Sequence, residues 1–245
     1  MANLAGKVVL VTGGARRIGH AIALASAGAG AEVAITYLAS ESEARKTARE
    51  VEALGRRTMA VRCDVRSEKS AQTAVKAVLR HFGRLDVLVN NAGFYETAEF
   101  GDITPQQWSK MFETNTQGPY IMAKACRAAL KKSEGRIVNL GSLGGMRPWV
   151  THAHYCASKA ALGMLTQIMA KAFAPQITVN CVAPGMIETG AQPAKMLRRF
   201  AAKTPMRRNG QPEDVAEAVL WFARAPKFIT GQVLVVDGGL GLLTV

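Results

Sequence analysis

The segment from Lys7 to Ala23, KVVLVTGGARRIGHAIA, constrains the fold more than any other part of this sequence. It opens with four consecutive apolar residues, Val8 to Val11, and such a run predicts a strand that is buried on both faces. Gly13 and Gly14 interrupt the run, and from Ile18 the apolar residues recur with the period of a helix. A strand, a glycine turn and a helix in this order direct backbone N–H groups and the positive end of the helix dipole at one point. We therefore predict a phosphate site at this turn.

The glycine spacing alone leaves a second interpretation open. Gly13 and Gly19 do not match the plain G-x-G-x-x-G fingerprint of dinucleotide-binding turns. An ordinary tight turn between a strand and a helix would have the same composition. The rest of the chain decides between the two.

Strand and helix patterns alternate to the end of the chain. Ser40 with Glu43, and Ser67 with Ser70, have the spacing of helix N-caps, and glycines close several of the helical segments. The predicted strands cover 8–11, 32–38, 57–63, 85–89, 135–140, 177–182 and 232–236. A first helix is predicted to begin at Ile18, and further helices cover 41–54, 68–82, 104–130, 152–173 and 212–223, with an irregular or helical insertion at 186–205.

This alternation, without linker-like composition or internal repeats, indicates one α/β domain over residues 1–245. The expected architecture is the Rossmann fold, a doubly wound parallel sheet of about seven strands flanked by helices. Ligands of such folds bind at the carboxyl ends of the strands, where the strand order reverses. Small or polar residues follow the predicted strands at Thr12-Gly13, Asp64, Asn91, Ser142 and Pro184-Gly185, which favours a binding site over a simple turn.

Composition excludes several other classes. The four cysteines (Cys63, Cys126, Cys156, Cys181) form no C-x-x-C pair, so we expect no metal site and no disulfide framework. No apolar stretch approaches the ~18 residues of a membrane span, and the first residues lack a secretory pattern, so a cytoplasmic protein is expected. The net charge of +13 is spread along helices, which indicates solvated faces and attraction of anionic ligands rather than a nucleic-acid interface.

The turn and the second strand predict which dinucleotide is bound. NAD sites place an acidic residue at the end of the second strand, whereas NADP sites use cations or hydroxyls there. In this chain the strand ends without an acid before Glu41, and Ser40 is the adjacent hydroxyl. Arg16 and Arg17 lie in the turn, and guanidinium groups bind phosphate through paired hydrogen bonds. If these arginines bind the cofactor, the cofactor is NADPH/NADP+. The alternative is that both arginines only face solvent.

Tyr155 and Lys159 are four residues apart and therefore share one face of a predicted helix. A phenol ionises near pH ~10, and an ammonium group one turn away is expected to lower the pKa of Tyr155. Ser142, at the end of a neighbouring strand, can hydrogen-bond a substrate oxygen. A Tyr-x-x-x-Lys pair alone is usually a surface pair. Together with Ser142 and the glycine turn it favours hydride transfer to a carbonyl, with Tyr155 donating the proton.

Over essentially its whole length the chain resembles the short-chain dehydrogenase/reductase family. In chain order, the family's motifs fall on Thr12–Gly19, Asp64 with Val65, Asn90–Gly93, Asn115, Ser142, Tyr155, Lys159, and Pro184 with Gly185. The resemblance implies a catalytic set of Asn115, Ser142, Tyr155 and Lys159. It implies cofactor contacts from Gly13, Arg16, Arg17, Ile18, Ser40, Asp64, Val65, Asn91, Ala92, Gly93, Tyr155, Lys159, Pro184, Gly185 and Ile187.

The resemblance also implies particular roles. Asp64 would contact the adenine ring, and Asn115 would hold a water that relays protons to Lys159. Ile187 and Thr189 would lie near the nicotinamide amide and the phosphates. The family resemblance further implies a homotetramer or homodimer.

Arg17 stands where the family usually has glycine, which is similar to the NADPH-dependent pteridine reductase branch. That branch typically has aspartate where this chain has Ser142. The leading interpretation is an NADPH-dependent oxidoreductase that reduces a carbonyl to an alcohol, of the 3-oxoacyl-thioester or general ketone reductase type. A pteridine reductase-type enzyme and a non-catalytic NADPH-binding sensor are the alternatives. The substrate is expected to be a small carbonyl compound, either free or linked to a carrier or CoA.

Several residues are candidates for the walls of a substrate pocket. Five large apolar residues follow motif residues: Phe94, Tyr95, Met146, Trp149 and Met186. Trp149 is the best candidate for the pocket. The other four could equally pack in the core. His152 and His154 are expected at a helix end rather than in catalysis. The insertion at 186–205 is either a lid or a surface loop. Basic residues that could dock an acidic carrier protein, or simply be solvated, are Lys131, Lys132 and Arg136.

Overall fold

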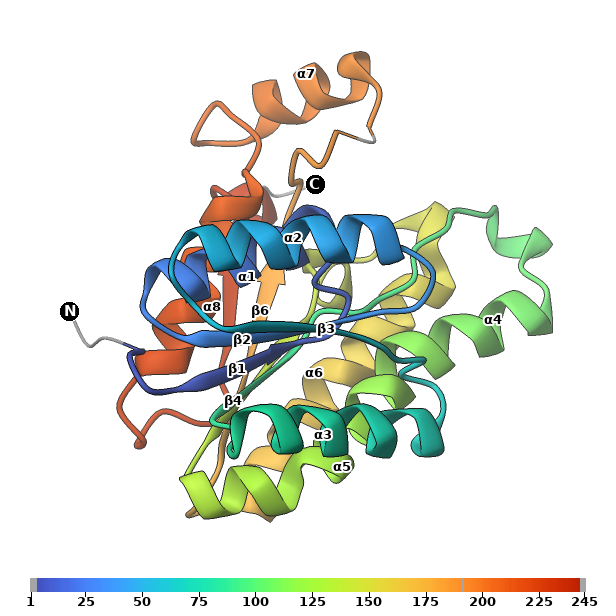
Figure 1. Cartoon of the computed structure of the whole chain (residues 1–245). Helices are drawn as coiled ribbons and strands as arrows, with labels where there is room; N and C mark the ends of the chain where they lie inside the picture. The colour runs from blue at the N-terminus through green and yellow to red at the C-terminus, as the bar shows by residue number, and fades with distance from the viewer. Residues whose placement is uncertain (1–3, 191, 243–245) are drawn as a thin grey trace.

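β1 (Val8–Val11) occupies the middle of a parallel sheet (Figure 1). In the computed structural model, the described residues 4–190 and 192–242 form seven strands in the order β3-β2-β1-β4-β5-β6-β7, and every pairing is parallel. The other strands are β2 (Glu32–Tyr37), β3 (Thr58–Arg62), β4 (Val87–Asn90), β5 (Arg136–Leu140), β6 (Thr178–Pro184) and β7 (Val233–Val236). The order reverses between β1 and β4, so a ligand crevice is expected at their carboxyl ends.

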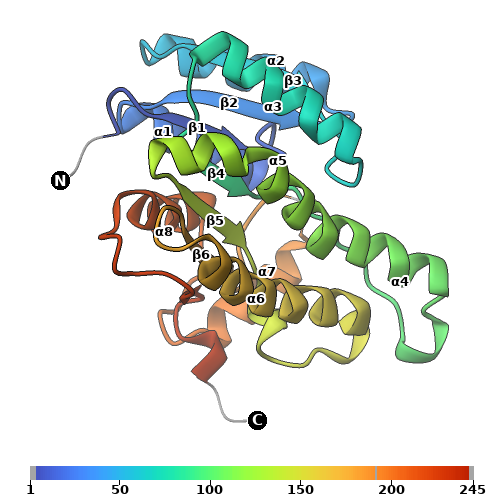
Figure 2. The same ribbon diagram turned by 90° about the horizontal axis from the view of Figure 1, so that it is seen from below.

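Helices cover both faces of the sheet. One face carries α1 (Arg17–Gly28), α2 (Glu41–Ala53) and α8 (Pro212–Arg224), above the sheet in Figure 1. The other carries α3 (Glu68–Phe82), α5 (Gly118–Ser133) and α6 (Ala153–Phe173), which lie side by side in Figure 2. α4 (Pro105–Phe112) precedes α5, and α7 (Ala194–Lys203) lies beyond the strand ends. Short 3-10 turns span Phe100–Asp102, Leu143–Gly145, Val150–His152 and Leu240–Leu242.

The apolar run of β1 is buried on both sides, as its sequence predicts. Val9 and Val11 pack into the core under α1 and α8, whereas Val8 and Leu10 pack under α3 and α5. Successive side chains of a strand point to opposite faces, so one uninterrupted apolar run serves two cores. The predicted doubly wound sheet of seven strands is therefore confirmed.

Two local predictions need correction. The helical region predicted over 104–130 is interrupted by a π-helical turn, Glu113–Gln117, between α4 and α5. Ser40 does precede α2, but among the described residues its side chain makes no capping hydrogen bond. Its backbone (φ −90°, ψ 61°) is not the extended conformation that directs a hydroxyl at the helix N–H groups. Ser67 is extended and accepts a hydrogen bond from Ser70 N at 3.3 Å, as predicted.

The predicted insertion at 186–205 contains α7, and its residue 191 lies outside the described residues, as do 1–3 and 243–245 of the predicted domain. Within the described ranges, no helix has the length and apolar character to cross a bilayer. The same ranges contain no cluster of three or more His, Cys, Asp or Glu side chains that could bind a metal.

Asp86 links β1 and β4 at the end of the sheet opposite the crevice. Its buried carboxylate accepts hydrogen bonds from Val8 N (2.9 Å), Arg84 (2.6 and 2.8 Å) and Lys7 (3.3 Å). Burial alone would raise the pKa of Asp86, but the hydrogen bonds from Arg84 and Val8 and the two positive charges hold it below its ordinary value. The ionised carboxylate therefore stabilises the folded state.

Asp86→Asn should lower the free energy of unfolding by about 2–4 kcal/mol at neutral pH, because the arginine and lysine then face an uncharged group. A carboxylate whose pKa is depressed in the folded state stabilises that state at pH values above its unfolded pKa. This stabilisation is lost as the pH falls. The difference between the two proteins should thus shrink below pH ~4. Urea titrations measure this, with Glu52→Gln on the exposed face of α2 as the control. An equal loss in both variants would contradict this role of Asp86.

Candidate active site

The glycine turn after β1 is held against the neighbouring strand β2. Gly13 has a left-handed backbone (φ +63°) and donates its N–H to Thr36 Oγ1 at 3.2 Å. Gly14 N donates to the Thr36 carbonyl at 3.1 Å. The turn is therefore a fixed structure at the carboxyl ends of the central strands.

Asn91, at the end of β4, ties the turn to the other neighbouring strand. Its Nδ2 donates to the carbonyl oxygens of Thr12 (2.9 Å) and Gly13 (3.0 Å). In return, Thr12 Oγ1 accepts hydrogen bonds from Asn91 N and Ala92 N, both at 3.0 Å. The predicted site residues Asn91 and Ala92 are thus brought directly against the glycine turn.

Gly19 lets helix α1 approach this assembly. A Cβ at Gly19 would overlap the Gly13 carbonyl oxygen and would lie 2.5 Å from Asn91 Nδ2. The first turn of α1 contains no acidic residue, and within the described chain the preceding Arg16 side chain makes no capping hydrogen bond. Unsatisfied N–H groups at a helix N-terminus attract anions, so the site fits the pyrophosphate of a dinucleotide.

The two arginines of the turn are exposed. Arg16 Nη1 lies 3.8 Å from Glu43 Oε1, so the N-terminus of α2, which Ser40 precedes, lies beside this arginine. Arg17 has φ +54°, a left-handed conformation that costs a side-chain-bearing residue about 1–3 kcal/mol. This backbone geometry explains why glycine is common at the position. The end of β2 beside these arginines carries Tyr37 rather than an acid.

Asp64 and Val65 follow β3. The Asp64 carboxylate accepts two hydrogen bonds from Arg66, at 2.9 and 2.7 Å, a pairing that was not predicted. These bonds, against the effect of burial, hold the pKa of Asp64 below its ordinary value. Val65 is buried, and its side chain would meet a Cβ placed on Gly118. The adenine contacts predicted for both residues stay predictions.

Pro184 ends β6, and Gly185 follows it. A Cβ at Gly185 would lie 2.6 Å from the Cβ of Asp237, so only glycine fits between β6 and the segment after β7. Ile187 is buried and forms a bridge to Gly210, which anchors the start of the 186–205 insertion. Thr189 Oγ1 donates to Gln192 at 3.2 Å.

Ser142 and Tyr155 form a pair of hydroxyl groups at the end of β5. Ser142 is buried and its Oγ accepts from Gly144 N at 3.1 Å. Burial raises the pKa of Tyr155 to about 12, although a hydrogen bond from Ser142 lowers it. The structure therefore brings the two predicted catalytic hydroxyls together, with the phenol protonated at neutral pH.

Lys159 lies one turn further along α6. Its Nζ donates to the Leu140 carbonyl at 2.8 Å and lies 5.9 Å from the centre of the Tyr155 ring. Burial lowers the pKa of Lys159 to about 8. The pKa of Tyr155 is therefore raised and not lowered as predicted, because burial of the phenol outweighs the hydrogen bond with Ser142.

Asn115 lies in the π-helical turn and is fully buried. Its Oδ1 accepts from Phe94 N at 2.7 Å, and its Nδ2 donates to the Phe94 carbonyl (2.9 Å) and to Ser158 Oγ (3.1 Å). Ser158 Oγ in turn donates to the Tyr155 carbonyl at 2.8 Å. The side chain of Asn115 thus positions the segment after Gly93 and helix α6, and the water relay assigned to it stays a prediction.

Ser158 is a positioning residue that the sequence analysis missed. The only signal was its place inside the Tyr-x-x-x-Lys motif, on the helix that carries both catalytic side chains. Gly93 completes the arrangement, because its Cβ position lies 3.3 Å from Asn115 Oδ1 and 3.7 Å from Lys159 Nζ. Gly13, Ala92, Gly93 and Lys159 are therefore close neighbours, since a Cβ on Gly13 would lie 3.1 Å from Ala92 Cα.

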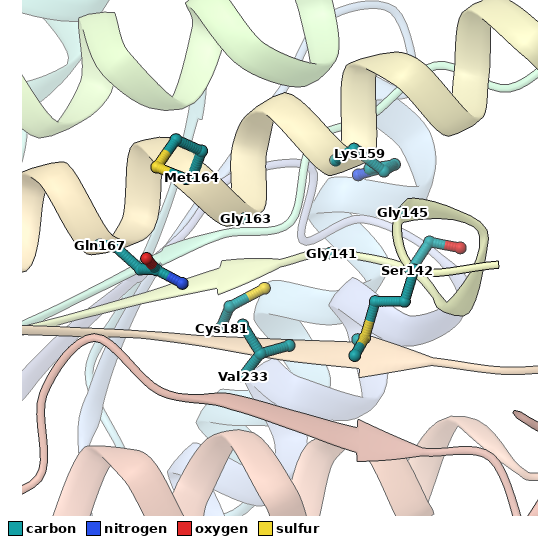
Figure 3. Close-up of a pocket in the computed structure, with 12 residues that line it drawn as sticks. Gly141, Ser142, Gly145, Lys159, Gly163, Met164, Gln167, Cys181 and Val233 are labelled. Atoms are coloured by element: carbon teal, nitrogen blue, oxygen red, sulfur yellow. The ribbon is translucent and has the colours of Figure 1, made fainter. Parts of the chain in front are cut away.

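Lys159 and Ser142 also line a cavity of about 280 Å³ (Figure 3). Lys159 on α6 and Cys181 on β6 face it from either side, and Ser142 lies at one end. Its walls include several small residues, Gly141, Gly145, Ala160, Gly163 and Ala183, which leave the space open. Burial raises the pKa of Cys181 to about 11, so the thiol is uncharged at neutral pH.

The segments after β4 and after β5 meet beside Tyr155. Trp149 packs on Gly144, whereas Met146 is exposed and the ring of Phe94 lies under Lys110 Nζ at 3.8 Å. His152 and His154 lie at the start of α6, as predicted. His154 is fully buried, 3.6 Å from the Glu96 carboxylate.

Gly19→Ala should destabilise the protein by at least about 2 kcal/mol, because the added methyl displaces the Gly13 carbonyl and Asn91. Gly28→Ala is the matched control in the same helix, since a Cβ there meets nothing within 4 Å. It should stabilise by about 0.5–1 kcal/mol. Urea unfolding of both variants measures the difference. Equal stability of the two would show that the close packing of the glycine turn is unimportant.

Known proteins resemble this chain in sequence and in fold. A family model described as Enoyl-(Acyl carrier protein) reductase matches residues 13–241. The 3-oxoacyl-[acyl-carrier-protein] reductase of Synechocystis is 36% identical over 244 residues, covering 98% of this chain and 99% of the relative. A blue fluorescent protein from a metagenomic library, solved with NADPH, superposes with TM-score 0.91 at 34% identity and covers 98% of this chain and 99% of its own.

A Serratia marcescens short-chain dehydrogenase/reductase mutant superposes with TM-score 0.93 at 33% identity, covering 98% of this chain and 100% of its own. The shared fold, the matched motifs and the full-length similarity lead to one assignment. This chain belongs to the short-chain dehydrogenase/reductase family, whose members are oxidoreductases that use NAD(H) or NADP(H).

Proposed function

We propose that the protein is an NADPH-dependent carbonyl reductase. The observation that carries the proposal is the pairing of Ser142 and Tyr155 beside Lys159, next to a turn that fits a dinucleotide. Two hydroxyl donors that converge on one point suit a carbonyl oxygen, which becomes negative as it is reduced.

The residues that would hold the cofactor line the carboxyl ends of the strands. The N-terminus of α1, with Gly13 and Ile18, would bind the pyrophosphate, and Arg16, Arg17 and Ser40 the 2′-phosphate. When bound, NADPH supplies the hydride. The adenine would contact Asp64 and Val65, and the nicotinamide half would contact Asn91, Ala92, Gly93, Lys159, Pro184, Gly185 and Ile187. A relative solved with NADPH supports this choice of dinucleotide.

Tyr155 would act as the general acid. Its pKa of about 12 keeps the phenol protonated at neutral pH, so it can donate a proton to the developing alkoxide. Ser142 would donate the second hydrogen bond to the same oxygen. Lys159, with a pKa of about 8, is mostly cationic at neutral pH and stabilises the phenolate that the transfer leaves. Asn115 would complete the proton relay through Lys159.

The substrate of this proposal is a small carbonyl compound, either free or linked to a carrier or CoA. The similarity to a 3-oxoacyl-[acyl-carrier-protein] reductase is the reason for including the carrier-linked form. Lys131 and Lys132 are exposed and suit an acidic carrier, but the half-buried Arg136 donates to the Ala225 carbonyl at 3.1 Å and is less available.

We also propose a homotetramer or homodimer in the cytoplasm, without nucleic-acid or membrane partners. Exposed apolar side chains on α5, α6, α8 and β7 support self-association, namely Tyr120, Met164, Ile168, Trp221 and Leu234. All four cysteines are free thiols, which suits a reducing compartment.

Tyr155→Phe should retain NADPH binding within about threefold and lose carbonyl reduction by roughly 10³-fold or more, because the proton donor is removed. NADPH oxidation followed by absorbance measures turnover, and fluorescence titration measures binding. Tyr120→Phe, on the exposed face of α5, is the control. Near-normal turnover by Tyr155→Phe would refute the mechanism. NADPH binding by the wild type without turnover of any carbonyl would instead favour a binding protein.

A further inference from the structure

Four rings form a continuous row beside the catalytic hydroxyls. Trp149 lies 5.5 Å from His152, His152 lies 5.3 Å from Tyr95, and Tyr95 lies 5.0 Å from Tyr155, measured between ring centres. We call Tyr95, Trp149 and His152 the aromatic wall. The three residues come from two segments that are distant in sequence, the loop after β4 and the segment before α6.

The aromatic wall extends from the surroundings of Ser142 to those of Tyr155. At one end the Trp149 indole packs against Gly144, whose N–H donates to Ser142 Oγ; a Cβ on Gly144 would lie 3.0 Å from the indole. At the other end the ring of Tyr95 meets that of Tyr155 nearly at right angles (86°). A carbonyl bound between Ser142 and Tyr155 therefore has this wall beside its substituents.

Hydrogen bonds hold the wall in place. The Tyr95 hydroxyl lies 2.5 Å from His152 Nε2, and His152 Nδ1 lies 2.8 Å from Thr151 Oγ1. Burial lowers the pKa of His152, and the neighbouring His154 lowers it further, which favours the neutral ring. A neutral ring donates from one nitrogen and accepts at the other, so it can bond to both hydroxyls. The bond from Ala98 N to the Thr151 carbonyl (3.1 Å) fixes the two segments to each other.

The wall is fixed but is not covered by protein. Tyr95 is 52% exposed, and Trp149 and His152 are half-buried. Large aromatic side chains left partly open beside a reactive site offer stacking and edge contacts to a flat ligand. A rigid flat ligand also loses less conformational freedom on binding than a flexible chain does.

We propose that the aromatic wall selects planar, conjugated ring ketones over flexible acyl thioesters as substrates. This inference rests on the proposed carbonyl reduction and narrows its substrate class. Stacking would align the ring so that its carbonyl oxygen meets Ser142 and Tyr155. The polar edge formed by Tyr95 and His152 would face hydroxyl or ring oxygen substituents.

The test compares kcat/KM for a flat substrate, menadione or 1-tetralone, with kcat/KM for S-acetoacetyl-N-acetylcysteamine, using NADPH and the full-length protein. The wild type should prefer the flat substrates. Tyr95→Leu and Trp149→Leu should each lower the flat-to-thioester ratio by at least about tenfold. Tyr95→Phe keeps the ring and the backbone bond from Ala98 to Thr151 that joins the two segments, so it should change the ratio by less than about threefold. Phe100→Leu, an exposed ring in the same loop outside the row, is the matched control.

A wild-type preference for the thioester, or an unchanged ratio in both leucine variants, would overturn the inference. A binding measurement distinguishes failure of this inference from failure of the proposed reaction. If no carbonyl is turned over, the proposed function fails, and binding of 1-naphthol to the NADP+ complex then decides. Binding that Tyr95→Leu weakens at least about tenfold supports the aromatic wall, and binding that the variant leaves unchanged overturns it.

Discussion

The hydrogen bonds between Asn91 and the turn after β1 are the interactions on which the rest of the site depends. They join the carboxyl ends of β1 and β4, where the strand order reverses. Gly19 brings the positive end of α1 onto the same turn. A shift of Asn91 would therefore displace the dinucleotide-binding turn and, through Ala92 and Gly93, the surroundings of Lys159. The same contacts, at the point where the strand order reverses, therefore position both the proposed cofactor-binding turn and the proposed catalytic residues.

The catalytic groups are placed by a second set of contacts. Asn115 bonds to the backbone of Phe94 and to Ser158, and Ser158 bonds to the Tyr155 carbonyl. The β4 loop and helix α6 are thus held as one unit. Burial then fixes the protonation states: the phenol of Tyr155 stays protonated and the amine of Lys159 has a pKa of about 8. The arrangement is suited to donating a proton rather than to removing one.

The sequence predicted the sheet because its strands are short segments rich in apolar and β-branched residues, and β1 is the clearest example. It predicted that the motif residues lie close together, because they follow strands whose carboxyl ends meet at one edge of the sheet. It could not predict the π-helical turn around Asn115, the missing cap at Ser40 or the pairing of Asp64 with Arg66. These depend on backbone angles and on local side-chain geometry. The raised pKa of Tyr155 depends on burial, which a spacing of four residues does not reveal.

Transfer of isotope from labelled cofactor tests the central claim most directly. The wild-type protein would be incubated with a ketone and NADPH that carries deuterium at both C4 positions of the reduced nicotinamide. The account predicts an alcohol that carries one deuterium on the former carbonyl carbon, because the hydride passes directly between the two molecules. Alcohol formed without deuterium, or NADPH that stays bound and unoxidised with every carbonyl offered, would contradict it.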